Sequence, residues 1–292
     1  MGVEANKHFS TGKNTIFLSH ITLNDYAEAD RVLVQKTVSE AVKSDPQTFI
    51  ETYKRHPEAH GGKYVAADLF KETFAEYSAS KDSRNRYNGP VHNSAAVLSA
   101  ELFKQNLDEH RSSGKQVIFL TGMPGVGKTS SVLVGGEIPA HVAMIFEGQM
   151  SNPVTSIDKI QQVINAGLLP TIQVIHAKPE IALTNTLTRL EEVGRGASIN
   201  VMASIQGGLP SSLEQIRAQY GDGIELSIID KRTPGGVSIH TGWQHVEILK
   251  SEGTYEQIKA TLSNSLESRR AQQALGGTAY RQAAGLPPIT RG

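Results

Sequence analysis

The chain has 292 residues, with 29 Lys plus Arg against 29 Asp plus Glu, so its formal net charge is zero. This balance argues against a protein held to nucleic acid or to anionic lipid by bulk charge. The sequence contains no cysteine, which excludes disulfides and thiolate metal sites. It also lacks an apolar run long enough for a signal core or a membrane span, so we expect no membrane association and a cytoplasmic protein. An effector injected into another cell would show the same pattern, so that form of secretion stays open.

The N-terminal part is predicted to be helical. Residues 24–43 place apolar side chains at helical spacing, and Asn24 or Asp25 can cap this helix. A second helix is expected to start at Pro46, where Asp45 precedes a proline in the first turn.

This pattern predicts three regions along the chain. Residues 1–60 form an N-terminal helical segment, residues 61–250 a core, and residues 251–292 a C-terminal helix with a flexible, basic tail. Three roles stay open for residues 24–55: a surface for an antitoxin, a built-in inhibitory segment, or a cover for the sheet of the core.

The first part of the core mixes element types. Residues 61–70, GGKYVAADLF, predict a turn, a short strand and the start of a helix, and residues 80–90 predict a polar loop. Residues 93–111 then predict a helix that Asn93 or Ser94 can cap.

Short apolar runs bounded by Gly or Pro follow, and they alternate with amphipathic helices. The runs are QVIFLTG, HVAMIFEG, TIQVIHA and IELSIID, and the intervening helices include residues 155–167 and 178–194. A last helix is expected over residues 255–269. This alternation indicates an α/β fold with a mostly parallel sheet and helices on both faces.

The segment GMPGVGKT, from Gly122 to Thr129, fits the P-loop pattern GxxxxGK[ST] at every fixed position, and a strand precedes it while a helix follows. Its glycines allow backbone N–H groups to point at phosphate oxygens. Lys128 is expected to reach the outer phosphates, and the Thr129 hydroxyl to bind Mg²⁺. We therefore predict a P-loop kinase-like fold that binds ATP or GTP, with ATP and Mg²⁺ preferred, through Gly122, Met123, Pro124, Gly125, Val126, Gly127, Lys128, Thr129 and Ser130.

The rest of the sequence favours phosphoryl transfer to a small acceptor. The chain lacks the DxxG and NKxD motifs of GTPase switches, and the run AMIFEG ends in a lone Glu147 instead of the Asp typical of motor ATPases. Asp68 and Glu147 each follow a predicted strand, which is where a general base is expected in a parallel sheet. Arg189 and Arg195, at the end of a helix, supply candidate cations for the transferred phosphoryl group.

Several of these segments together resemble the zeta toxin family. VAADLFKETFAEY is similar to the family's D-x-F-K…P-E-Y segment, VHNSAAVLSAELF to its H-x-x-S helix, MIFEGQMSNP to its E-G-T strand end, and KPEIALTNTLTRLEEVGRGAS to its arginine-bearing lid. The resemblance covers about residues 63–232.

The resemblance implies a kinase that phosphorylates a hydroxyl of a UDP-amino sugar and is held inactive by a small antitoxin. It implies that Asp68 is the general base and that Arg189 and Arg195 stabilise the transferring group beside Lys128. It also implies acceptor contacts from Lys71, His92, Glu147 and Gln149, of which Glu147 is an alternative metal contact.

Two departures from the family pattern matter. The base-bearing segment precedes the P-loop here but follows it in zeta toxins, as a circular permutation would produce. Gln149 also replaces the family's threonine, which leaves NAD open as an alternative acceptor to a UDP-sugar.

Two other functions remain as alternatives. A polynucleotide kinase would need a groove rich in basic and aromatic side chains, whereas aromatic residues make up only 6% of this chain, so nucleic acid is not the expected partner. A non-catalytic nucleotide-binding module with a protein partner is the third reading.

Overall fold

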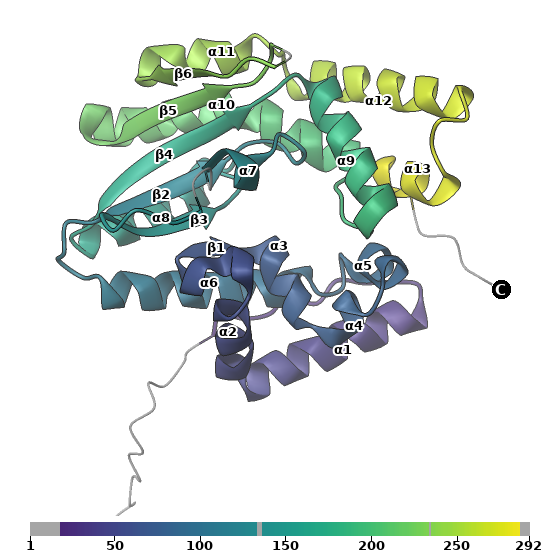
Figure 1. The fold of residues 1–292 in the computed structure, drawn as a ribbon, viewed down its shortest axis with the longest axis horizontal. Coiled ribbons are helices and arrows are strands. Elements are labelled where there is room, and N and C mark those ends of the chain that lie inside the picture. The colour runs from purple at the N-terminus through teal and green to yellow at the C-terminus, as the bar shows by residue number, and fades with distance from the viewer. Residues whose placement is uncertain (1–17, 133–135, 234, 287–292) are drawn as a thin grey trace, which may run out of the picture.

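The computed structural model describes residues 18–132, 136–233 and 235–286. These residues contain one six-stranded sheet with the strand order β1-β3-β2-β4-β5-β6 (Figure 1). The strands are β1 (Tyr64–Ala66), β2 (Gln116–Thr121), β3 (Val142–Glu147), β4 (Leu169–His176), β5 (Glu225–Asp230) and β6 (Ser238–Thr241). β1 to β5 pair in parallel, and only β6 is antiparallel to its neighbour. The predicted α/β class with a mostly parallel sheet is confirmed.

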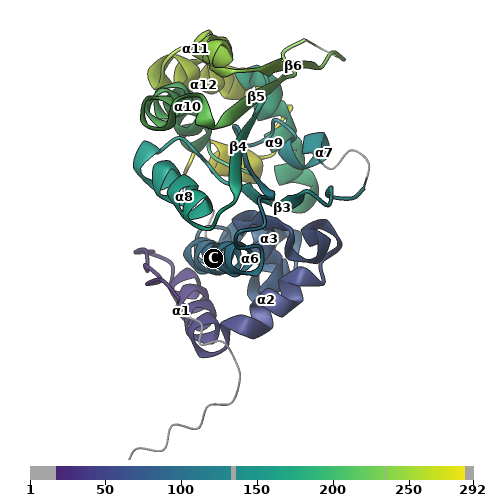
Figure 2. The same ribbon diagram turned by 90° about the vertical axis from the view of Figure 1, so that its left-hand side faces the viewer.

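Helices cover both faces of this sheet. Figure 2 views the sheet nearly edge-on, with α8 and α10 on one side and α7 and α9 on the other. The α-helices of the described residues are α1 (Ala29–Ser44), α2 (Pro46–Lys54), α3 (Ala67–Phe70), α4 (Ala75–Ser78), α5 (Lys81–Tyr87), α6 (His92–Glu109), α7 (Lys128–Val132), α8 (Pro153–Asn165), α9 (Pro179–Val193), α10 (Ile199–Tyr220), α11 (Val246–Lys250), α12 (Tyr255–Ala271) and α13 (Gly277–Ala283). Within the described part of the chain, none of them has the length and apolarity that crossing a bilayer would require.

The N-terminal helices belong to the same hydrophobic core as the sheet. Val38 and Val42 of α1 and Ile50 of α2 are buried in one cluster with the residues of the strands. Tyr53 of α2 stacks on Phe70, with ring centroids 3.7 Å apart. The first two helices therefore cover the β1 side of the sheet instead of forming a separate unit.

Tyr53 also completes the hydrogen bonding of the edge strand β1. Its hydroxyl donates to the carbonyl of Tyr64 (2.8 Å) and accepts from the backbone N–H of Ala66 (3.0 Å). An edge strand leaves one row of backbone groups unpaired, and a buried unpaired group costs free energy. The Tyr53 hydroxyl supplies partners for two of these groups.

Two helix starts differ from the prediction. α1 begins at Ala29 after Glu28, which makes no side-chain cap, while the backbone of Asn24 exchanges two hydrogen bonds with the side chain of Gln35. α6 begins at His92, and the amide of Asn93 donates to the Thr22 carbonyl instead of capping. The predicted capping residues therefore bond to Gln35 in the middle of α1 and to Thr22 in a distant segment instead of capping their helices. The predicted role of Asp45 is confirmed, because its side chain accepts from the backbone N–H of Thr48 (3.2 Å).

Sequence patterns did not predict α5, β6 and α10. The expected loop at residues 80–90 contains α5, which Ser80 caps by accepting from Ser83 N–H. β6 and the long helix α10 also lay outside the prediction, and α10 contains Gly207, Gly208 and Pro210. Glycine and proline disfavour a helix. Gly207 is nevertheless required for packing, because a Cβ at this position would lie 2.8 Å from the backbone of Tyr255 at the start of α12. The glycine allows the two helices to approach closely.

The described part of the expected C-terminal tail is ordered. α12 extends to Ala271 and starts with a capping box formed by Thr254 and Gln257. α13 follows, and its Ala283 is fully buried against the core. The described part of the predicted tail, up to residue 286, thus includes a helix packed on the core and a mostly exposed connection before it, and the last residues, 287–292 with Arg291, lie outside the described residues.

Candidate active site

The loop between β2 and α7 has the backbone of a phosphate-binding loop. Gly122, Gly125 and Gly127 all adopt positive φ values, of 136°, 87° and 78°. A Cβ on Gly122 would lie 2.3 Å from the carbonyl oxygen of Ile175, and one on Gly125 would lie 2.1 Å from that of Ala182. Side chains are therefore excluded at both positions by backbone conformation and by contact.

Helix α9 holds this loop from outside. The amide of Asn185 donates to the Gly125 carbonyl (2.8 Å), and Thr186 lies beside the same glycine. Arg189 follows about one turn further along the helix, where it is exposed. It does not line the cavity described below.

Lys128 folds back onto its own loop and meets a carboxylate. Its ammonium donates to the carbonyls of Gly122 (3.0 Å) and Met123 (3.4 Å) and lies 3.4 Å from Glu147 Oε1. The hydroxyl of Tyr64 on β1 donates to Glu147 and lies 3.3 Å from the Thr129 hydroxyl. Burial and the nearby Glu147 carboxylate raise the pKa of Tyr64 above its usual range, so it stays protonated and remains a donor.

Oxygen ligands for a hard cation meet in this cluster. The Thr129 hydroxyl and the Glu147 carboxylate both contact the Tyr64 hydroxyl. Mg²⁺ is commonly held by one or two such protein oxygens, with phosphate oxygens and water completing the shell. No group of three or more His, Asp or Glu side chains suited to a metal occurs in the described ranges. The residues present thus fit an ion that arrives with a nucleotide.

Asp68 lies on α3, directly after β1, and forms an ion pair with Lys71. The distance from Lys71 Nζ to Asp68 Oδ1 is 2.7 Å, and the same ammonium donates to Asn88 Oδ1 at 2.7 Å. The Asp68 side chain is 65% exposed because it faces a cavity, whereas Lys71 is 3% exposed. The charge of Lys71, assisted by that of Arg195, holds the pKa of Asp68 well below its usual range against the opposing effect of desolvation. Asp68 is therefore ionised at neutral pH.

His92 begins α6 beside this ion pair. Burial and, secondly, the Lys71 ammonium lower the pKa of His92 below its ordinary value, although Asp68 opposes the shift. His92 is consequently neutral at pH 7 and offers a hydrogen-bonding imidazole instead of a charge.

Arg195 stands just past the end of α9 and is fixed by a carboxylate. Its guanidinium lies 3.5 Å from Glu72, and the Glu72 carboxylate also accepts hydrogen bonds from Nε and Nη2 of Arg84. The helix ends at Gly194 in the left-handed conformation, and a Cβ there would meet the Lys81 carbonyl at 2.1 Å. The unpredicted helix α5 thus sets the position of Arg195.

One cavity of about 690 Å³ joins the P-loop to the Asp68 cluster, a size within the range of about 300–1,000 Å³ typical of small-molecule sites. Of the residues predicted to act in the site, its lining includes Asp68, Lys71, His92, Pro124 and Gln149. Lys128, Thr129 and Glu147 form the adjoining cluster under the loop, and Arg195 is next to the lining residues Gly196 to Ser198.

Both ends of the described chain supply further walls that sequence reasoning missed. The segment before α1 and the start of that helix contribute Asn24 to Glu28 and Arg31, and the C-terminal region contributes Thr278, Arg281, Gln282, Gly285 and Leu286. No motif marks these residues. Lys231, directly after β5, also lies near the P-loop. Its place at the carboxyl end of a parallel strand is the sequence signal that could have identified it.

Comparison with known proteins adds little to this geometry. No protein-family model matches the chain. No curated protein matches it either.

Solved structures show distant similarity. A chain of the AvrRxo1-ORF1:AvrRxo1-ORF2 complex with sulphate ions aligns at 12% identity and TM-score 0.48, covering 89% of this chain and 90% of that one. The native complex of the same pair aligns at 13% identity and TM-score 0.40, covering 64% and 85%. The PezAT chromosomal toxin-antitoxin system of Streptococcus pneumoniae aligns at 10% identity and TM-score 0.41, covering 86% and 97%. At these values the similarity does not assign the chain to a family.

Proposed function

We propose that the chain is a kinase that transfers the γ-phosphoryl group of ATP to a hydroxyl of a small, nucleotide-containing metabolite such as a UDP-amino sugar. The observation that carries this proposal is the single cavity lined by both Asp68 and the P-loop residue Pro124. Phosphoryl transfer needs a base for the acceptor hydroxyl and a cradle for the phosphates in one space. Here the carboxylate from α3 and the loop after β2 meet that requirement, although β3 separates their strands.

Each group has a defined part in the reaction. Asp68 accepts the proton of the acceptor hydroxyl as its oxygen bonds to the γ-phosphorus and the bond to the bridging oxygen of ADP breaks. Lys128 leaves the carbonyls of Gly122 and Met123 to pair with the phosphates, and Arg195 offsets the charge of the transferring group. Mg²⁺, held by Thr129 with Glu147 close by, supplies further charge neutralisation when bound.

The decisive experiment incubates the purified protein with Mg-ATP and a metabolite extract, followed by mass spectrometry for the compound that gains a phosphate. Asp68→Asn is expected to reduce transfer to that compound by about two to four powers of ten, because the base is lost. Binding of ADP should persist in this variant, since Asp68 contacts the acceptor side. Asp222→Asn is the matched control, because that carboxylate is 84% exposed on a remote turn. Transfer at the wild-type rate by Asp68→Asn, or labelled phosphate on an oligonucleotide alone, would overturn the proposal.

The relation to zeta toxins and the regulation of the site are further parts of the proposal. β1 precedes the P-loop strand in the chain and yet lies beyond β3 in the sheet, which is compatible with the circular permutation that the sequence resemblance suggests. An antitoxin that blocks the cavity remains a prediction, and copurification with the product of a neighbouring gene would test it.

A further inference from the structure

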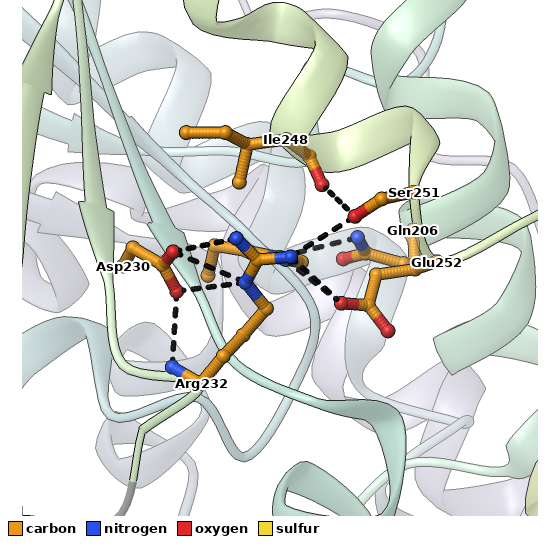
Figure 3. A network of polar contacts seen from close by, with 7 residues as sticks. Gln206, Asp230, Arg232, Ile248, Ser251 and Glu252 are labelled. Atoms are coloured by element: carbon orange, nitrogen blue, oxygen red, sulfur yellow. Dashed lines mark hydrogen bonds and ion pairs between the residues drawn. The ribbon is translucent and has the colours of Figure 1, made fainter.

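Two basic residues follow β5, and the structure gives them different surroundings. Figure 3 shows Arg232 in a network of polar contacts from several elements. Its guanidinium donates to both oxygens of Asp230 at 2.8–3.1 Å and to the Ser251 hydroxyl at 3.0 Å, and it lies 3.6 Å from Glu252. Arg232 is therefore committed to holding the end of β5 against the turn between α11 and α12.

The backbone between these two residues is fixed as well. The N–H of Lys231 donates to the carbonyl of His176, at the end of β4, over 2.7 Å. The imidazole of His176 is fully buried between Glu252, 3.3 Å from Nε2, and Gln206, 3.3 Å from Nδ1. The strand end that carries Lys231 is thus anchored on both sides.

The side chain of Lys231 points the other way and reaches the P-loop. Its ammonium lies 3.5 Å from the carbonyl oxygen of Gly127. The hydroxyls of Ser130 and Ser131 donate to the same oxygen, at 3.1 and 2.5 Å. A carbonyl oxygen has two lone pairs, so three side-chain donors exceed its capacity. Lys231 also has no carboxylate within ion-pairing distance among the residues described, which leaves most of its donor capacity for a ligand.

We propose that Lys231 is a second phosphate-binding lysine, which contacts the phosphate chain of a nucleoside di- or triphosphate bound in the P-loop. This inference rests on the proposed function, because it requires that the loop binds a nucleotide. Arg232 acts as a positioning residue for it. The lack of a side chain at Gly127 keeps the approach open, since a Cβ there would lie 3.3 Å from the Lys231 ammonium.

The test measures binding of Mg-ADP and Mg-GDP by isothermal titration calorimetry to the full chain and its variants. Lys231→Met should weaken binding of the preferred nucleotide about tenfold to a hundredfold, the range expected for one charge-assisted hydrogen bond. Lys231→Arg should restore most of the affinity, because it keeps the charge. Lys43→Met, an exposed lysine on α1, is the control and should bind as the wild type does. Thermal unfolding of each variant reports whether the fold is retained.

The possible outcomes separate the two proposals. If the wild-type chain binds neither nucleotide, the proposed function fails. If the wild type binds and a folded Lys231→Met variant binds equally well, the role of Lys231 is wrong while the proposed function stands. A loss that Lys231→Arg does not restore would also overturn the phosphate contact, because it would indicate a packing role.

Discussion

Lys71 keeps the Asp68 carboxyl group ionised in the cavity. A nearly buried ammonium 2.7 Å from the carboxylate favours the ionised form of the acid. The pKa of Asp68 is thereby lowered, which keeps the base unprotonated over the physiological range but also makes it weaker. The same ammonium lowers the pKa of His92, so a single lysine influences the protonation of two groups that line the site.

Replacing this lysine should change the pH dependence of the reaction. With Lys71 present, Asp68 remains ionised as the pH falls well below the usual pKa of a carboxyl group. Lys71→Met removes the largest cause of that shift, so Asp68 should take up its proton at a higher pH and the acid limb of kcat/KM should move upward. Lys71→Arg keeps the positive charge and should leave the limb near its wild-type position. In profiles between pH 4 and 8, the wild type and Lys71→Arg should therefore show no loss of kcat/KM through Asp68 protonation, whereas Lys71→Met should lose kcat/KM as the pH falls towards 4. A flat acid side in Lys71→Met would contradict the assignment.

At the scale of elements, the site depends on contacts between segments that are distant in the chain. α2 completes the edge of β1 through Tyr53, α9 holds the P-loop through Asn185, and α5 positions Arg195 through Arg84 and Glu72. Each helix therefore supports a neighbouring functional element instead of supplying the chemistry itself.

Removal of the Tyr53 hydroxyl tests how much α2 contributes to stability through the edge of β1. Tyr53→Phe keeps the stacking on Phe70 but leaves the buried carbonyl of Tyr64 and N–H of Ala66 without their partner, which should lower the free energy of unfolding by about 1–3 kcal/mol. Tyr280→Phe is the matched control, because its hydroxyl bonds Glu267 in an exposed position. Urea unfolding of both variants measures the difference. Equal stability of Tyr53→Phe and the wild type would show that water replaces the lost hydroxyl.

At the scale of the whole molecule, the two ends of the described chain close the site. Residues before and within α1 and residues around α13 line the same cavity as Asp68. The N-terminal region therefore both covers the core and borders the proposed acceptor site. This position is compatible with a cover and with control of access to the cavity, and a surface for an antitoxin stays a prediction.

Deletion of residues 1–55 separates these two roles. Because Val38, Val42, Ile50 and Tyr53 are at most 2% exposed, their removal should uncover the β1 side of the core and give an insoluble or strongly destabilised protein. Soluble yield and thermal unfolding measure this outcome. A soluble, stable truncation with faster phosphoryl transfer would instead identify the N-terminal region as inhibitory.

The sequence by itself determined the P-loop, four of the six strands within about two residues, β1 in outline, and the helices α1, α2, α6, α8, α9 and α12, although α1 starts later than predicted. These elements have strong local signals, such as continuous apolar runs, helical spacing, and stops like Gly194. Local signals also led to an error: the turn propensities of residues 80–90 favoured a loop, whereas packing made the helix α5. No local pattern indicated α10, which contains the weak helix formers Gly207, Gly208 and Pro210.

Only the tertiary structure decided which of the candidate residues share one space. Asp68 and Pro124 are distant in the chain and follow two strands, β1 and β2, that β3 separates, so no periodicity relates them. The walls contributed by both chain ends and the approach of Lys231 to Gly127 follow from strand order and helix packing. Sequence spacing determines which side chains lie together within one helix or strand. Which helices and strands lie together depends on long-range contacts, which spacing does not reveal.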